Sequence, residues 1–344
     1  MRDPLRHHGD VEARDAALDF AVNVYDGPRP PWLDDALRGS LDQVGRYPDP
    51  TRAQQAVATH HGRPVEGVLV TAGAAEAFTL IARLRPWRMP VVVHPQFTEP
   101  HAALEQAGHH VTSVVLPEPF TLDPAAVPDD ADLVVIGNPT NPTGVLHPAD
   151  EIRALLRPGR VVVVDEAFMD CVPGEVESLA GSRAPGLLVI RSLTKHWGIP
   201  GVRAGYVVGD AVVVAGLALN QTPWSVGATA AAAVVACTTP EAAGEARRRA
   251  EEIRDWRDHL EKGLTDLGIP HLSATASFVL ARVGEGVHDA LRAAGIAVRR
   301  ADTFPGLDGS WVRVAVRPPA TTDLLLDALA ALYGVEVSTS RSSA

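Results

Sequence analysis

Short apolar segments alternate with helical segments from about residue 50 to residue 210, and this alternation limits the folds open to the chain. Several of the apolar segments consist almost entirely of Val, Leu and Ile, which is typical of strands buried on both faces. Strands that alternate with helices indicate an α/β fold with a mostly parallel sheet between two layers of helices. We expect seven strands, at about 68–71, 91–93, 112–116, 133–137, 161–165, 187–191 and 205–208, with helices at 51–61, 74–84, 98–107 and 149–156.

The rest of the chain indicates a smaller α+β unit. Residues 225–237 are alanine-rich and apolar on nearly every side but too short to span a bilayer, so we expect a buried helix. A long amphipathic helix at about 240–264 should link two domains, and short strands between helices follow it. The expected division is an N-terminal arm over 1–29 that joins the small domain, a large domain over 30–218, a small domain over 219–335 and a disordered tail over 336–344.

Composition and charge exclude several classes of protein. With 344 residues, of which 46% are hydrophobic, the chain can bury a large core. The net charge of −11 and the lack of a long Lys/Arg block argue against nucleic acid as a partner. Cys171 and Cys237, the two cysteines, lack metal-ligand spacing and suit a reducing compartment. The acidic N-terminus indicates neither a signal peptide nor a membrane span, so we expect a cytoplasmic protein without a metal centre.

A lysine stands among hydroxyls, glycines and an arginine just after an apolar strand. Lys195 follows Ser192 and Thr194, and Arg203 comes eight positions later. An unprotonated lysine amine attacks carbonyl groups, and hydroxyl and guanidinium donors bind phosphate. The pattern therefore indicates a site for a phosphate-bearing aldehyde cofactor, while a surface Ser-x-x-Lys turn is the plainer alternative for this motif alone.

Two more expected strands end in polar residues. The strand at 133–137 is followed by Asn-Pro-Thr-Asn-Pro-Thr-Gly, which stops the strand ladder and exposes Asn141, an amide that can donate to a phenolate oxygen. The strand at 161–165 ends in Asp165. An acid at the carboxyl edge of a sheet usually meets a cation or a metal, and its plainer alternative role is to cap a helix.

Together these motifs resemble the fold-type I, aspartate aminotransferase-like superfamily of pyridoxal phosphate enzymes, over about residues 7 to 333. The resemblance rests on the order Asn-Pro-x-Asn-Pro-Thr-Gly, then Asp-Glu-Ala-aromatic, then Ser-x-x-Lys with its later arginine. It implies the fold type I architecture and pyridoxal 5'-phosphate as cofactor. It also implies that Lys195 condenses with the cofactor aldehyde, that Asp165 pairs with the pyridine nitrogen, that Asn141 contacts the ring hydroxyl, and that Ser192, Thr194 and Arg203 bind the phosphate.

Three further features complete the expected cofactor site. A strand, a glycine turn and a helix start over 68–78 would direct the backbone N–H groups of Ala74 and Ala75 at phosphate, although an ordinary strand-to-helix connection has the same pattern. Phe97 stands where the family has an aromatic residue stacked on the ring, and is otherwise a core residue. Tyr47 resembles the family tyrosine that reaches the phosphate of the neighbouring subunit, which implies a homodimer with shared active sites.

Within the superfamily the chain resembles the branch of histidinol-phosphate aminotransferase and cobalamin-pathway L-threonine-O-3-phosphate decarboxylase. The His-His-Gly start, Leu-Asp-Phe-Ala-Val-Asn at 18–23, and Phe168 resemble the decarboxylase more closely. We therefore expect a decarboxylase for threonine phosphate, with an aminotransferase as the alternative and a non-catalytic binding protein as a remote one. Sequence does not fix which bond of the substrate breaks.

The resemblance implies a phosphorylated amino substrate. Arg313 and Arg317 are four residues apart on an expected strand and would face the same side, so one would bind a carboxylate and the other a phosphate. The family pattern departs at Tyr25-Asp26, where relatives carry Asn-Pro, and at Phe168, which leaves Asn141 as the single contact to the ring oxygen. The expected substrate-binding residues are His8, Asn23, Arg313 and Arg317.

Overall fold

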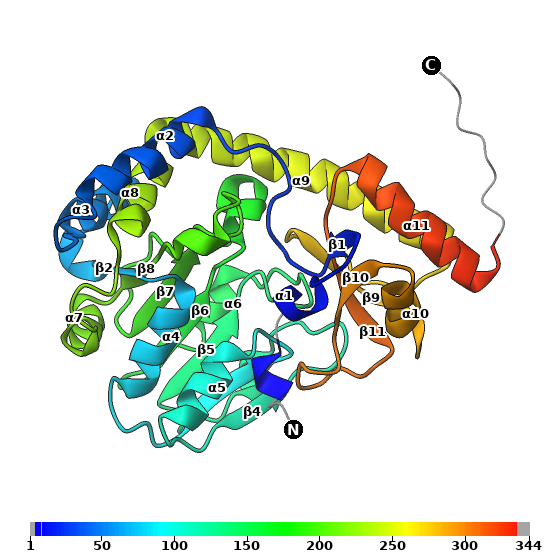
Figure 1. The fold of residues 1–344 in the computed structure, drawn as a ribbon. Helices are drawn as coiled ribbons and strands as arrows, with labels where there is room; N and C mark the ends of the chain where they lie inside the picture. The colour runs from blue at the N-terminus through cyan, green and yellow to red at the C-terminus, as the bar shows by residue number, and fades with distance from the viewer. Residues whose placement is uncertain (1–3, 8, 336–344) are drawn as a thin grey trace.

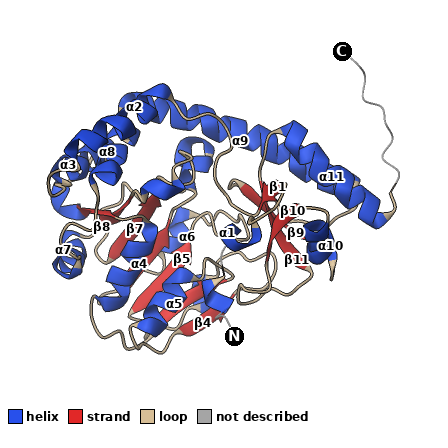
Figure 2. Cartoon of the chain, viewed as in Figure 1, coloured by secondary structure: helices blue, strands red, loops and turns tan. Residues whose placement is uncertain are grey.

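A computed structural model describes residues 4–7 and 9–335 of the chain (Figure 1). The expectations for His8 and for a tail over 336–344 lie outside these residues. The described chain contains two sheets that do not share a hydrophobic core, and helices pack around both of them (Figure 2).

The larger sheet has seven strands in the order β2-β8-β7-β6-β5-β3-β4. β8 pairs antiparallel with both of its neighbours, and the other strand pairs are parallel. This confirms the predicted mostly parallel, seven-stranded sheet. The strands are β2 (Val68–Thr71), β3 (Pro90–His94), β4 (Thr112–Val115), β5 (Leu133–Gly137), β6 (Val161–Asp165), β7 (Leu187–Ser192) and β8 (Gly205–Gly209).

Both faces of this sheet are covered, because successive side chains of its strands enter different cores. In β5, Val134 and Ile136 belong to the core shared with α2, α3 and α8, whereas Leu133 and Val135 belong to the core shared with α4, α5 and α7. The covering helices are α2 (Pro31–Gly39), α3 (Thr51–His60), α4 (Ala74–Arg83), α5 (Glu99–Gln106), α6 (Ala149–Arg153), α7 (Ala211–Asn220) and α8 (Ala228–Cys237).

The smaller sheet has the order β1-β10-β11-β9 and joins the beginning of the chain to its end. β1 (Leu18–Phe20) runs parallel to β10 (Ile296–Arg300), and β10 is antiparallel to β11 (Trp311–Ala315), which is antiparallel to β9 (Phe278–Arg282). The predicted arm thus contributes a strand to the sheet of the C-terminal region. The exact domain boundaries stay a prediction.

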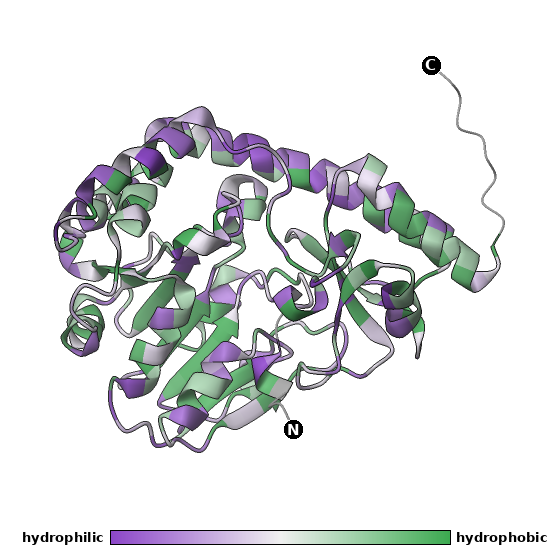
Figure 3. Cartoon of the chain, viewed as in Figure 1, coloured by the Kyte–Doolittle hydropathy of each residue, from purple (hydrophilic) through white to green (hydrophobic). Residues whose placement is uncertain are grey.

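The long predicted helix is α9 (Pro240–Asp266), which packs on α11 (Pro319–Tyr333). Its outer face is polar, in contrast to the apolar strands of the large sheet (Figure 3). Within the described residues, no helix combines the length and apolar character needed to cross a lipid bilayer. The remaining helices are α1 (Gly9–Glu12), α10 (Val287–Ala293) and 3-10 turns at Pro4–Arg6, Ser40–Gln43, Val65–Gly67, Pro124–Ala126, Met169–Cys171, Pro173–Glu175 and Pro200–Val202.

Candidate active site

The polar ends of β5, β6 and β7 meet at a cavity of about 510 Å³. Parallel strands present their carboxyl ends at the same edge of a sheet, so residues that follow different strands converge there. The cavity is lined by most of the residues that the sequence singles out: Asn23, Ala74, Ala75, Phe97, Asn141, Asp165, Ser192, Thr194, Lys195, Arg203 and Arg313.

Lys195 and Asp165 have pKa values shifted toward each other. Burial lowers the pKa of the Lys195 amine to about 8, helped by the positive charges of Arg203 and Arg313 and opposed by Asp165. Burial raises the pKa of the Asp165 carboxyl to about 6, opposed by the backbone N–H of Ala167 and by Lys195. A lysine and a buried acid whose pKa values are both shifted toward neutrality are typical of a site that handles protons.

A phosphate-sized anion fits beside the lysine. The backbone N–H groups of Ala74 and Ala75 open α4, which no side chain caps at Gly73. Gly73 has a φ of 75°, and a Cβ there would lie 2.7 Å from Arg203 Nη2, so the glycine gives the guanidinium room to reach this helix end. The hydroxyls of Ser192 and Thr194 lie 2.8 Å apart and share one hydrogen, which leaves one O–H to donate to a ligand.

Asn141 links the lysine end of the cavity to a buried arginine. Its side-chain oxygen accepts a hydrogen bond from Arg313 Nη1 at 2.6 Å, so its Nδ2 amide hydrogens are available to donate elsewhere. Phe97 packs at the same cavity near Phe78, with ring centroids 6.2 Å apart. Phe168 also lines the cavity and meets Phe278 edge-on at 4.8 Å.

A second buried arginine, which the sequence reasoning missed, lies beside Arg313. Arg299 on β10 is the cross-strand partner of Arg313 on β11, so both side chains project from the same face of the small sheet, and both line the cavity. Their hydrogen bonds go to backbone carbonyls, to Asn141 and to the Thr303 hydroxyl. Neither forms an ion pair with a carboxylate in the described part of the chain.

This arrangement is costly without an anion. Directly opposed like charges destabilise a sheet, and burial disfavours an uncompensated cation. Burial lowers the pKa of Arg299 to about 10, and burial together with the charge of Arg299 lowers the pKa of Arg313 well below its usual range. The pair is therefore arranged to receive negative charge from a ligand. The hairpin register of β10 and β11 is the signal that would have identified Arg299.

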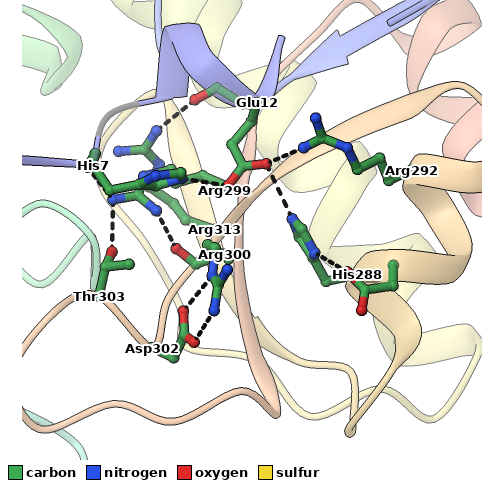
Figure 4. A network of polar contacts seen from close by, with 11 residues as sticks. His7, Glu12, His288, Arg292, Arg299, Arg300, Asp302, Thr303 and Arg313 are labelled. Atoms are coloured by element: carbon green, nitrogen blue, oxygen red, sulfur yellow. Dashed lines mark hydrogen bonds and ion pairs between the residues drawn. The ribbon is translucent and has the colours of Figure 1, made fainter. Parts of the chain in front are cut away.

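The N-terminal segment covers this end of the cavity. His7, Gly9 and Asp10 line it, and so does Asn23, whose buried Oδ1 accepts no hydrogen bond from the described residues. Arg299 Nη2 donates to the His7 carbonyl at 2.6 Å, and Arg313 Nη2 donates to the Ala21 carbonyl at 2.6 Å (Figure 4).

Two predicted residues lie elsewhere. The expectation that Arg317 faces the same site as Arg313 is wrong in its geometry, because β11 ends at Ala315 and Pro318 and Pro319 turn the chain into α11. Arg317 does not line the cavity, and its guanidinium donates to the carbonyls of Asp19, Val22, Val24 and Val316.

Tyr47 also lies outside this cavity. It is 77% exposed and stacks on Trp224, itself 61% exposed, with ring centroids 4.5 Å apart. A stacked, exposed aromatic pair is unusual on a free surface, since large apolar side chains normally find cover.

A lysine and an acid at neighbouring strand ends, with a phosphate cradle beside them, define a cofactor-dependent enzyme of the α/β class. The family model for aminotransferase class I and II matches residues 16–332, and the chain belongs to this family. It is 47% identical to a histidinol-phosphate aminotransferase of Mycobacterium bovis over 318 residues, covering 91% of this chain and 87% of the relative.

Two further comparisons agree. The chain is 32% identical to the threonine-phosphate decarboxylase of Salmonella typhimurium over 333 residues, covering 92% of this chain and 91% of that protein. The solved structure of the histidinol-phosphate aminotransferase from Clostridium acetobutylicum superposes with a TM-score of 0.86 at 26% identity, covering 92% of this chain and 99% of that one. The predicted superfamily, its fold and its pyridoxal phosphate-dependent enzyme class are therefore confirmed, whereas the expected preference for decarboxylation is the less supported of the two.

The residues that line the cavity fit pyridoxal 5'-phosphate. Asp165 is buried beside an open cavity with one hydrogen bond, from Ala167, so the carboxylate can still accept from a protonated ring nitrogen. The opening turn of α4, Arg203 and the Ser192–Thr194 hydroxyls match the phosphate, and Lys195 matches the aldehyde. When bound, the cofactor supplies an electron sink for a carbanion at the substrate Cα.

Proposed function

We propose that this chain is a pyridoxal phosphate-dependent aminotransferase for a phosphorylated amine, with histidinol phosphate as its substrate. The observation that carries the proposal is the Arg299–Arg313 cross-strand pair, which is buried, lines the cavity and has no carboxylate partner among residues 4–7 and 9–335. Guanidinium groups bind phosphate and carboxylate bidentately. The greater identity to a histidinol-phosphate aminotransferase than to a decarboxylase supports transamination.

Arg299 and Arg313 can bind the anionic groups of both substrates of an aminotransferase, one in each half-reaction. Histidinol phosphate, the amino donor, offers one phosphate and no carboxylate, and a dicarboxylic keto acid as acceptor offers two carboxylates. In the first case both guanidinium groups share the phosphate charge, and in the second each binds one carboxylate. Arg317, with its donors engaged by carbonyls, is assigned no substrate role in this proposal.

The chain's own groups account for the proton transfers. Lys195, with a pKa of about 8, would take the proton from the substrate Cα as a general base and then hold it as a general acid. Asp165 would hold the ring nitrogen of the cofactor and keep it protonated. Asn141, held by Arg313, donates to the ring oxygen, and the unpartnered Asn23 Oδ1 accepts from the substrate amine.

Decarboxylation of threonine phosphate is the second candidate. It is favoured by the same arginine pair, because this substrate carries a carboxylate and a phosphate, one anion for each guanidinium. A single assay separates the two. We expect keto product from histidinol phosphate only when 2-oxoglutarate is present. Release of carbon dioxide from O-phosphothreonine, without that keto product, would replace the first candidate by the second.

We also propose a homodimer in which Tyr47 serves the partner's site. The support is the exposed Tyr47–Trp224 stack together with Leu41 and Val44, which are 60% and 66% exposed in the same region of the chain. Arg203 is also exposed while lining the cavity, as expected for a site completed by a second copy. Sedimentation analysis of the holoenzyme tests this, and a monomer that is fully active would contradict it. The cytoplasmic location stays a prediction.

A further inference from the structure

Glu12 is a buried carboxylate at the centre of a group of cationic side chains next to the cavity. It is 3% exposed, and its Oε1 lies 2.6 Å from His7 Nε2. Its Oε2 lies 2.8 Å from Arg292 Nη1 and 3.4 Å from His288 Nε2 (Figure 4). Both oxygens are thus engaged, which is the condition for keeping a carboxylate ionised in a buried position.

These contacts join parts of the chain that are far apart in sequence. Glu12 ends α1, and His288 and Arg292 lie on α10, almost 280 residues later, so the carboxylate ties the N-terminal segment to the small sheet's helix. α1 also packs on β10, the strand that carries Arg299. Burial disfavours ionised Glu12, but hydrogen bonds from His288 and His7 outweigh it and hold the pKa of this carboxyl at about 2.

The link to the cavity runs through His7. The His7 side chain is held by Glu12, the residue lines the cavity, and its carbonyl accepts from Arg299 Nη2. The same Nη2 reaches the Thr303 hydroxyl at 2.7 Å, and Nη1 reaches the Arg300 carbonyl at 2.6 Å. Arg299 is therefore fixed by neutral oxygen atoms, one of which is in place because Glu12 holds His7.

We propose that Glu12 is a positioning residue for phosphate recognition: by holding His7 over the cavity it fixes Arg299 in the orientation that binds the substrate phosphate. The inference rests on the proposed function, since it assigns the Arg299 end of the cavity to the phosphate. It is specific to the phosphorylated substrate, because Glu12 touches neither Lys195 nor Asp165. Asn141 and Arg313 are held by contacts of their own.

The competing role for Glu12 is a purely structural one. A clamp between α1 and α10 would stabilise the fold and affect every substrate alike. Glu12→Gln separates the two, because glutamine keeps the volume but loses the charge. Its amide also brings N–H groups toward a site surrounded by donors. The matched control is Glu118→Gln, which removes a 2.9 Å ion pair between Glu118 and Arg282 away from the cavity.

The experiment uses the holoenzyme, in which the cofactor fills its own phosphate site, and inorganic phosphate as a competitive probe. We expect Glu12→Gln to raise the phosphate inhibition constant and the KM for histidinol phosphate by about tenfold, the loss of roughly one charge-assisted contact. The kcat and the KM for unphosphorylated histidinol should stay within about twofold, and Glu12→Asp should restore part of the phosphate affinity. Glu118→Gln should change none of these values.

Equal loss for histidinol and histidinol phosphate, or an unchanged phosphate inhibition constant, overturns the inference. If Glu12→Gln does not fold, His7→Phe provides the test, because phenylalanine removes the ring nitrogen that Glu12 holds and leaves Glu12 paired with Arg292. It should weaken phosphate binding in the same direction, and an unchanged constant is contrary to the proposal. A wild-type enzyme that does not prefer histidinol phosphate refutes the proposed function instead, so the two failures are distinguishable.

Discussion

The two ends of the cavity are built in different ways. The lysine end consists of residues at the ends of neighbouring strands of one sheet, held by the sheet register itself. The arginine end is assembled from the N-terminal segment, β10 and β11, and there Arg299 and Arg313 donate to the carbonyls of His7 and Ala21. The residues that fit the cofactor thus lie at the strand ends of a single sheet. In the proposed function, substrate recognition lies where three distant parts of the chain come together, and changes there should alter specificity more than chemistry.

The largest effect is expected at the lysine. Lys195→Ala should abolish turnover and covalent capture of the cofactor while leaving the fold intact, because no other amine is placed at the aldehyde position. The chain has one other lysine, Lys262, which is exposed and paired with Asp266, so Lys262→Ala is the control. Borohydride reduction followed by peptide mapping should label Lys195 alone. Label on Lys262, or activity in Lys195→Ala above a trace, would show that Lys195 is not the lysine that reacts with the aldehyde.

The second largest effect is expected for Asp165→Asn. A neutral amide cannot keep the ring nitrogen protonated, so we expect cofactor to bind and the rate to fall by several orders of magnitude. Cofactor content and kcat measured on the same sample separate these effects. A rate within about tenfold of wild type, only ~1.4 kcal/mol of barrier, would mean that the acid has another role.

At the arginine end the expected effects are smaller and depend on the substrate. Arg299→Met should weaken the binding of histidinol phosphate by about tenfold to a hundredfold, since one charge-assisted contact is worth about 1.5–3 kcal/mol. The binding of histidinol should change little. The control is Arg300→Met, the next residue, which is exposed and bonds to Asp302. Steady-state KM values for both substrates check this. If Arg299→Met and Arg300→Met give the same KM values, Arg299 does not bind the substrate phosphate.

The smallest effect is a pH shift. Only the unprotonated Lys195 amine attacks the aldehyde, so covalent capture of cofactor by the apoprotein should rise with pH and level off above about 8. Because the positive charge of Arg313 helps to lower this pKa, Arg313→Met should move the midpoint to higher pH. Stopped-flow absorbance follows the capture. A midpoint unchanged by this variant would mean that the two ends of the cavity are not electrostatically connected.

The same contrast explains what the sequence could predict. Lys195, Asp165 and Asn141 stand in motifs directly after apolar strands, so local pattern and sheet geometry suffice to bring them together. Arg299 is followed by Arg300, and nothing local distinguishes the buried arginine from the exposed one. Their difference arises from the pairing of β10 with β11, a tertiary feature.

Arg317 differs from its expected position for a related reason: β11 ends at Ala315, so the alternation of a strand does not reach Arg317. The turn into α11 at Pro318 and Pro319 redirects the chain, and Arg317 then holds the carbonyls of the N-terminal segment. Its role in holding that segment depends on contacts over almost 300 residues, which no local pattern contains.

The most direct test of the account is the specificity of the wild-type holoenzyme for histidinol phosphate against histidinol, as kcat/KM with 2-oxoglutarate as acceptor. The buried Arg299–Arg313 pair predicts a preference for the phosphorylated amine of about a hundredfold, the worth of one strong charge-assisted contact of ~3 kcal/mol. Equal values for the two amines would contradict the assignment of the arginine end to phosphate.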